Sequence, residues 1–256
     1  MKRNFYWFVV AVSCLALAVL ACSALSSVPS LVSSGSSSNT GGGSNTGGNS
    51  NSGTSTGNSG NTSGSVGKVL FQDDFSNNNS GWGTGSDANK SVDYANNSFE
   101  FKVFEANDFV YSTPNDADYQ DVHVEVTASP TATDKNAAFG ILCDQQVTSE
   151  AFYYAAVTPA GQYAIAIAAI AKDDVFLTGG NNWKTSKLIP VNASSYTIGM
   201  DCGSDGTLTL YVNGKQIDSV TDTTYTKGHI GLFAWSDKKP NAMDISFANY
   251  IATSTK

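Results

Sequence analysis

The sequence predicts an all-β protein, a two-sheet antiparallel jelly-roll sandwich that is preceded by a disordered linker. Apolar and polar residues alternate with a period of two in short runs such as residues 99–103 and 122–126. Turn residues separate these runs, and Asn213 followed by Gly214 is the strongest hairpin signal. Residues 23–67 consist mostly of Ser, Gly, Asn and Thr, which cannot form an apolar core.

The expected strands follow one another between residues 69 and 251. Continuous apolar runs at residues 138–143, 152–157 and 163–171 predict buried strands. Alanine-rich residues 163–171 could also form a helix, but the turn at residues 159–161 favours a hairpin. Further strands are expected at residues 69–75, 196–202, 208–212, 216–220, 229–235 and 243–251. About a dozen strands with frequent turn signals indicate a sandwich.

The N-terminus has the features of an export signal. Lys2 and Arg3 precede apolar residues 5–21, which end just before Cys22. This junction resembles the lipobox of bacterial lipoproteins, although Leu20 departs from the small residue usual there. The resemblance implies cleavage before Cys22 and acylation of that cysteine. The alternative is an uncleaved membrane anchor, since a span needs roughly 17–25 residues.

Three segments follow from these observations. We expect a lipoprotein signal peptide at residues 1–21, a flexible Ser/Gly/Asn-rich linker at residues 22–67 and a folded domain at residues 68–256. A coil of this composition reaches roughly 35–40 Å, so the linker would act as a spacer. Both N-terminal alternatives place the domain outside the cytoplasm, at the cell surface or in the periplasm, and tether it to a lipid bilayer.

The charge of the chain limits its partners. The formal net charge of −8 argues against nucleic acid and against a polybasic contact with anionic lipid. An acidic surface is compatible with neutral glycans or cations, and also with simple solubility.

The cysteines predict one disulfide bond. Of the four cysteines, Cys14 lies in the apolar N-terminal segment and Cys22 is the expected lipidation site. Cys143 and Cys202 remain as a pair in an exported domain, where disulfides persist. Metal binding by this pair is not expected, because no Cys-x-x-Cys motif or histidine cluster accompanies it.

The order of short motifs resembles the concanavalin A-like lectin/glucanase sandwich, in its laminin-G-like and 3-keto-disaccharide-hydrolase-type branch. The resemblance covers nearly all of residues 69–251, and it implies two packed antiparallel sheets of six or seven strands each. This architecture hosts lectins, glycosidases and scaffolds, so it does not decide the function. The motifs lie at residues 71–75, 80–82, 139–143, 152–154, 161–163, 200–202, 208–214, 228–232 and 245–251.

The resemblance gives no reason to assign catalytic residues. Glucanases of this fold carry their carboxylates as Glu-x-Asp-x-Glu or a close variant on one strand, and no glutamate here has that spacing. His123 and His229, the two histidines, lie on separate expected strands. We therefore assign no catalytic residue and expect a non-enzymatic protein.

A calcium site is a further implication of the resemblance. Laminin-G-like relatives often bind calcium through Asp side chains, and Asp73 and Asp74 are the candidates. Ala248 stands where many relatives have an Asp ligand. The alternative is that Asp73 or Asp74 caps a turn, and no cofactor is required.

Two tryptophans are candidates for glycan contact, because sugars stack their C–H faces on aromatic rings. Trp183 lies in a polar loop with Asn181 and Asn182, and Trp235 ends a strand close to Asp237. The three polar residues would supply hydrogen bonds. The alternative is that each ring covers the edge of the core, as we expect of Trp82, a structural plug.

The sequence therefore predicts a membrane-tethered lipoprotein whose domain binds a glycan without catalysis. The alternatives are a structural or protein-interaction module of the cell surface and, less favoured, a glycoside hydrolase.

Overall fold

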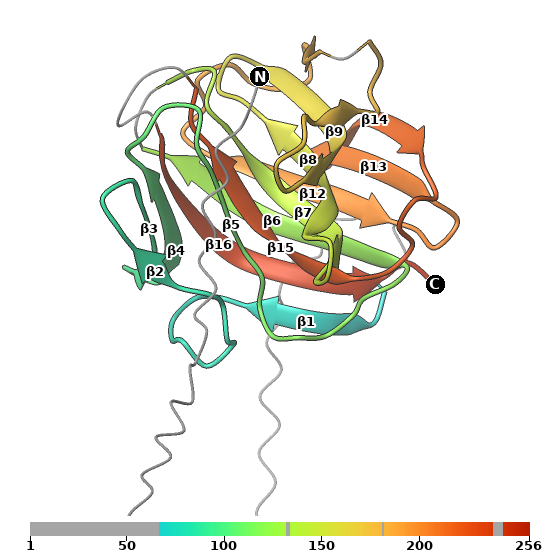
Figure 1. Ribbon diagram of the computed structural model, residues 1–256, viewed down its shortest axis with the longest axis horizontal. Coiled ribbons are helices and arrows are strands. Elements are labelled where there is room, and N and C mark those ends of the chain that lie inside the picture. The colour runs from blue at the N-terminus through green and yellow to red at the C-terminus, as the bar shows by residue number, and fades with distance from the viewer. Residues whose placement is uncertain (1–66, 132–133, 181, 238–242) are drawn as a thin grey trace, which may run out of the picture. The chain divides into compact units, whose positions relative to one another are not determined.

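The computed structural model describes residues 67–256 except residues 132–133, 181 and 238–242. The predicted signal peptide, Cys22 and nearly all of the predicted linker lie outside the described residues. Within them the chain forms sixteen strands and no helix, in two antiparallel sheets that pack as a sandwich (Figure 1). The predicted all-β jelly-roll sandwich is thus confirmed. Among the described residues there is no helix that could cross a membrane.

The larger sheet has nine strands, more than the six or seven expected, because the two-residue β2 and the edge strand β1 extend it. β1 (Val69–Asp73) pairs with β16 in this sheet. Its other strands are, in spatial order, β14 (Lys215–Thr221), β13 (Thr207–Val212), β12 (Tyr196–Cys202), β6 (Val122–Pro130), β16 (Met243–Ser254), β4 (Ser98–Val103), β3 (Lys90–Ala95) and β2 (Gly85–Ser86).

The smaller sheet has seven strands and contains the alanine-rich segment. That segment forms β9, which pairs with β8 across the turn at residues 159–161, so the predicted hairpin is confirmed. β11 (Lys184–Thr185) pairs with β9 at the edge. The other strands are, in spatial order, β10 (Val175–Phe176), β9 (Gln162–Ala169), β8 (Ala151–Val157), β7 (Ala138–Gln146), β15 (His229–Trp235) and β5 (Phe109–Ser112).

The main core lies between the two sheets. Successive side chains of a strand point to opposite faces, so alternate residues of each strand face inward. Phe139 and Ile141 of β7 meet Val124 and Val126 of β6 in this core, and all four are fully buried.

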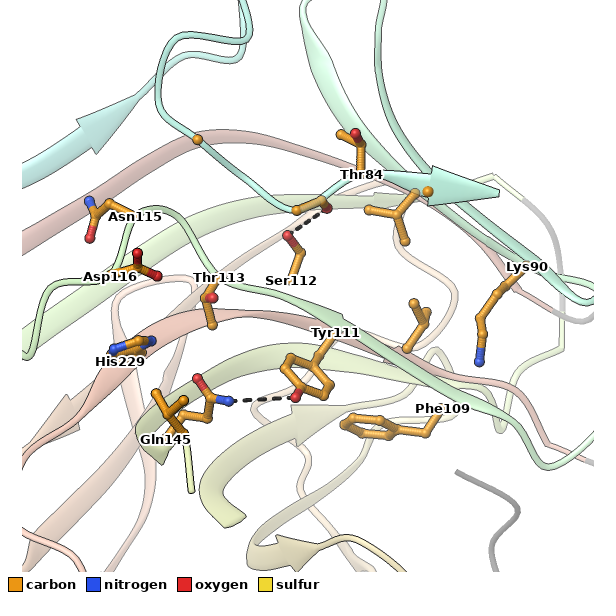
Figure 2. A pocket seen from close by; sticks show the side chains of 16 residues that line it. Thr84, Lys90, Phe109, Tyr111, Ser112, Thr113, Asn115, Asp116, Gln145 and His229 are labelled. Atoms are coloured by element: carbon orange, nitrogen blue, oxygen red, sulfur yellow. Dashed lines mark hydrogen bonds between the residues drawn. The ribbon is translucent and has the colours of Figure 1, made fainter. Parts of the chain in front are cut away.

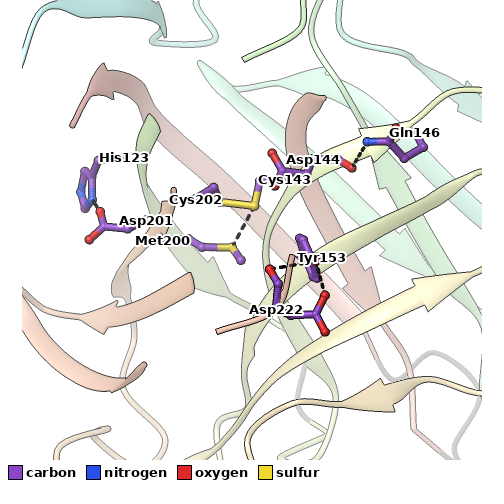
Figure 3. The surroundings of a disulfide bond; sticks show 9 residues. All are labelled: His123, Cys143, Asp144, Gln146, Tyr153, Met200, Asp201, Cys202 and Asp222. Carbon is purple, nitrogen blue, oxygen red and sulfur yellow. Dashed lines mark hydrogen bonds and ion pairs between the residues drawn. A yellow bond between two sulfur atoms is a disulfide. The ribbon is translucent and has the colours of Figure 1, made fainter. Parts of the chain in front are cut away.

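The predicted disulfide joins Cys143 of β7 to Cys202 of β12 (Figure 3). It therefore links the smaller sheet to the larger one through the core. Met200 also packs here, with its Sδ 3.9 Å from Cys143 Sγ.

Trp82 is the structural plug that the sequence predicted. It is 4% exposed, and its ring lies edge-on to Tyr250 at a centroid distance of 4.9 Å. Its indole Nε1 donates a hydrogen bond of 2.9 Å to Asp73 Oδ2. Trp82 thereby fixes the loop after β1 against the larger sheet.

Candidate functional site

The smaller sheet has an apolar outer face as well as an apolar inner face. In β8, Tyr153 and Ala155 belong to the main core, whereas Phe152 and Tyr154 belong to a second cluster. Since neighbouring residues of a strand point to opposite sides, the second cluster lies on the outer face of the sheet. We call this cluster the aromatic face. It comprises Phe109, Ala138, Leu142, Phe152, Tyr154, Ala156, Ala164, Ala166, Ala168 and Phe233, together with the partly buried Tyr111, Phe176, Trp183 and Trp235.

Small side chains alternate with rings across this face. Ala164 and Ala166 of β9 are cross-strand partners of Ala156 and Tyr154 of β8. Phe152 of β8 pairs with a third alanine of β9, and its ring packs against Phe109 at a centroid distance of 5.8 Å. Rings therefore stand beside alanines across this face. These central residues are at most 3% exposed, so the accessible ring surface belongs to the partly buried members of the cluster.

The structure brings the two candidate tryptophans together on the aromatic face. The rings of Trp183 and Trp235 are nearly parallel, with an interplanar angle of 18° and a centroid distance of 6.4 Å. Trp183 also lies edge-on to Phe176 at 6.1 Å. Both tryptophans pack on the outer face of the smaller sheet, away from the main core. Their contact with a glycan stays a prediction.

The polar residues that were predicted to hydrogen-bond the glycan have different surroundings. Asn182 is exposed next to Trp183, and Asn181 lies outside the described residues. Asp237 Oδ2 accepts a hydrogen bond of 3.3 Å from Asn136 Nδ2, and the Asp237 carbonyl accepts one of 2.8 Å from Asn107 N. Asp237 thus ties the end of β15 to two neighbouring loops.

A pocket of about 560 Å³ adjoins the aromatic face and shares Phe109 and Tyr111 with it (Figure 2). Its volume lies within the range of roughly 300–1,000 Å³ that small-molecule sites occupy. No motif in the sequence predicted this pocket. Its polar lining residues include Thr84, Ser112, Thr113, Asn115, Asp116, Gln145 and His229.

Lys90 and His229, which line the pocket, each have a carboxylate neighbour. Lys90 is buried, and its Nζ lies 3.1 Å from Asp108 Oδ2. His229 Nε2 lies 3.8 Å from Asp118 Oδ1. Pairing of this kind weakens the field that the pocket would present to an anion, so the pocket is better suited to a neutral polar ligand than to an anionic one.

Hydrogen-bonding groups lie close to the shared aromatic residues. Gln145 Nε2 lies 3.5 Å from Tyr111 Oη, and Ser112 Oγ donates a hydrogen bond of 2.9 Å to the Gly83 carbonyl. Gln145 and His229 are each 7% exposed. Of these pocket residues, the sequence singled out only His229, as a lone histidine on an expected strand. That pattern is not specific for a ligand site.

A buried carboxyl group neighbours the pocket at the end of β7. Burial raises the pKa of Asp144 to about 7, and the charge of Asp121 adds to the increase. Hydrogen bonds from Lys256 and Ser204 instead lower the pKa of Asp121 to about 2. Asp144 does not line the pocket, so we assign it no role in the site.

Asp73 and Asp74 act as turn caps, the alternative that the sequence left open. Asp73 Oδ1 accepts a hydrogen bond from Phe75 N, and its Oδ2 accepts the one from Trp82. Asp74 Oδ1 accepts a hydrogen bond from Ser76 N. Within the described part of the chain, no three His, Cys, Asp or Glu residues gather as a metal site. Calcium binding by this pair stays a hypothesis that competes with the turn-cap alternative.

Comparisons with known proteins agree on the fold. Neither a protein-family model nor a curated protein matches the chain. The structure is similar to the carbohydrate-binding module CBM66 from Bacillus subtilis, with a TM-score of 0.54 and 14% identity over 68% of this chain and 96% of that one. A galectin-like protein of unknown function from Bacillus subtilis has a TM-score of 0.56 and 10% identity, over 74% and 97% of the two chains.

A glucanase shares the same architecture. The β-glucanase of Bacillus licheniformis has a TM-score of 0.50 and 13% identity, and the match covers 74% of this chain and 99% of that one. At such identities the likeness shows the fold alone. The folded domain is a concanavalin A-like β-sandwich.

Proposed function

We propose that this protein is a membrane-tethered extracytoplasmic lipoprotein that binds a neutral glycan without catalysis. The glycan would lie on the aromatic face of the smaller sheet. The observation that carries this proposal is the parallel pair of Trp183 and Trp235 on that face, beside a pocket lined with hydrogen-bonding groups.

The physical chemistry of sugars fits this surface. A pyranose ring has an apolar C–H face, which packs on an aromatic ring, and a polar rim that needs hydrogen bonds. Trp183, Trp235, Phe176 and Tyr111 retain partial exposure and can offer ring surface. The pocket then supplies amide and hydroxyl groups. The acidic net charge of −8 favours a neutral ligand over an anionic one.

The strand positions of the aromatic face support binding without hydrolysis, because no pair of carboxylates lies among the described residues of this cluster. A carboxylate that is bonded to the cluster is that of Asp174, whose Oδ2 accepts a hydrogen bond of 2.7 Å from Tyr154 Oη. Glycoside hydrolysis generally needs two carboxyl groups that flank the scissile bond, about 5–10 Å apart. The outward positions of β8 and β9 hold only Phe, Tyr and Ala side chains in this cluster. Glu100 and Glu125 instead belong to β4 and β6 of the larger sheet. The similar solved structures include both a binding module and a glucanase, so the fold itself leaves the question open.

The tether would compensate for modest affinity. One stacking platform with few polar contacts binds in roughly the micromolar to millimolar range. A lipid anchor on Cys22 and a flexible linker at residues 22–67 would let several copies on one membrane engage one polymer. Such multivalent binding raises avidity without new contacts.

A glycan array with the full chain tests the binding. We expect retention of neutral oligosaccharides by the wild type and at least tenfold weaker retention by Trp183→Ala. Thr221→Ala, at an exposed position of β14 in the other sheet, is the matched control. A blank array would contradict the proposal and favour a protein-interaction module. Turnover of any retained glycan would instead indicate a glycoside hydrolase.

The tether is tested separately by Cys22→Ala. We expect this variant to accumulate as an unprocessed precursor or to leave the membrane fraction. Normal processing at the same site, with the protein still tethered, would contradict the lipoprotein assignment.

A further inference from the structure

We propose that the pocket receives the terminal sugar unit of a glycan that lies on the aromatic face, so that the protein recognises the ends of glycan chains. This inference rests on the proposed function and adds the part of the glycan that is recognised. It follows from the pairing of Trp235 with Phe109, which places the tryptophan pair beside the pocket, and from the polar groups that line the pocket.

The tryptophan pair lies beside the rings that line the pocket. Trp235 stacks with Trp183 on one side and is the cross-strand partner of Phe109 on the other. Phe109 lies 6.2 Å from Tyr111, and both line the pocket. Phe109 is only 3% exposed, whereas Trp235 and Tyr111 are partly exposed. A chain that stacks on Trp235 and Tyr111 would therefore extend to the pocket.

The pocket differs in character from the face. Figure 2 shows Asn115, Asp116, Gln145 and His229 on one side of the view and Phe109 on the other, with Tyr111 between. Gln145 and His229 are nearly buried, which restricts their side chains before any ligand arrives. The terminal unit of a glycan carries a hydroxyl where an internal unit carries a glycosidic bond. The fixed polar groups of the pocket would hydrogen-bond to that hydroxyl and so distinguish a terminal unit from an internal one.

The charges around the pocket select a neutral terminus. Lys90 has Asp108 as a partner, and His229 and Lys227 both lie near Asp118. Asp116 adds a negative charge at the polar side of the pocket. A terminal sugar acid would meet this negative charge, whereas a neutral hexose would not.

The experiment compares the two ends of the same glycans. The full chain is applied to an array that carries oligosaccharides of mixed-linkage β-glucan, β-1,3-glucan and mucin O-glycans, each immobilised once through its reducing end and once through its non-reducing end. Thr84→Trp places a large ring at the exposed Thr84, which lines the pocket. Thr221→Trp, on an exposed position of β14 in the other sheet, is the matched control.

We expect the wild type and Thr221→Trp to bind in one orientation only, and Thr84→Trp to bind at least tenfold more weakly at an unchanged melting temperature. Equal binding in both orientations would overturn the pocket proposal and leave glycan binding intact. Undiminished binding by a folded Thr84→Trp would do the same. If the wild type binds no oligosaccharide in either orientation, the proposed function itself fails. Because the two orientations are compared in the wild type, the test stands even if Thr84→Trp does not fold.

Discussion

Phe109 and Trp235 are cross-strand partners on β5 and β15, and both point to the outer side of the smaller sheet. β5 is the edge strand of that sheet, and its pairing with β15 places a pocket residue next to a member of the tryptophan pair. The register of these two strands thus aligns the pocket with the aromatic face. A shift by one residue would turn Phe109 and Tyr111 away from it.

Trp183 and Trp82 should respond differently to truncation. We expect Trp183→Ala to weaken glycan binding at least tenfold, or about 1.4 kcal/mol, because it removes half of the stacked pair. Trp82→Ala should lower the free energy of unfolding by about 3–5 kcal/mol, since Trp82 is buried in the core. Chemical denaturation and binding titrations measure both effects. If Trp183→Ala unfolds the domain, the ring is structural and the binding proposal loses its main support.

Removal of the disulfide should destabilise the domain without changing its fold. Cys143 and Cys202 are separated by 59 residues, and chain-entropy arguments give roughly 4 kcal/mol for a loop of this length. We expect the double variant Cys143→Ala/Cys202→Ala to unfold at lower urea concentration by about that amount. Reductant should shift the wild type toward the variant and leave the variant unchanged. Because Cys14 and Cys22 also carry thiols in the unprocessed chain, four reactive thiols instead of two in the denatured, unreduced wild type would show that the bond is absent.

The buried Asp144 should make stability depend on pH. Its pKa is raised from 3.8 to about 7 in the folded state, so the folded protein keeps a proton that the unfolded chain releases. The contribution is therefore complete below pH 3.8 and is lost as the pH rises to about 7. We expect Asp144→Asn to remove this slope and to be more stable than the wild type at pH 8. The asparagine tolerates the positive φ of 51° at this position.

The control for this measurement is Asp116→Asn, an exposed carboxylate of the pocket. Urea unfolding at intervals between pH 4 and pH 8 gives the free energy of unfolding for each protein. Identical slopes for the wild type and Asp144→Asn would show that this carboxyl titrates normally.

Calcium should have little influence on the loop that contains Asp73. Both carboxylate oxygens of Asp73 already accept hydrogen bonds, from Phe75 N and Trp82 Nε1. We expect Asp73→Ala to cost about 1–3 kcal/mol, because these buried donors lose their acceptor. Neither excess calcium nor a chelator should move the melting temperature of the wild type. A clear stabilisation by calcium that Asp73→Ala or Asp74→Ala abolishes would establish a metal site here.

Local patterns were enough to predict most strands and turns. Asn213 and Gly214 both adopt positive φ, 51° and 72°, in the hairpin between β13 and β14, as a two-residue hairpin turn requires. The turn before residues 162–169 likewise distinguished a strand from an alanine-rich helix. These features depend on residues that are close in sequence.

The candidate site was harder to predict from the sequence, because it depends on which strands become neighbours in the sheet. Phe152 and Tyr154 looked like ordinary core residues in a continuous apolar run, yet they face outward. Such a run indicates that both faces of a strand are covered or bind another molecule. This run was the sequence feature that could have predicted the aromatic face. The pairing of β15 with β5 was not encoded in any local pattern, so Phe109 could not be placed beside Trp235 beforehand.

The bond between Cys143 and Cys202 also has a consequence for the order of events in biogenesis. It fastens one sheet to the other, and a stable disulfide forms in an oxidising compartment. In a reducing compartment the two layers would lack this cross-link, and the domain would open more easily. If the chain is exported as proposed, the reduced form would be easier to translocate, and oxidation after transfer would then make unfolding less favourable.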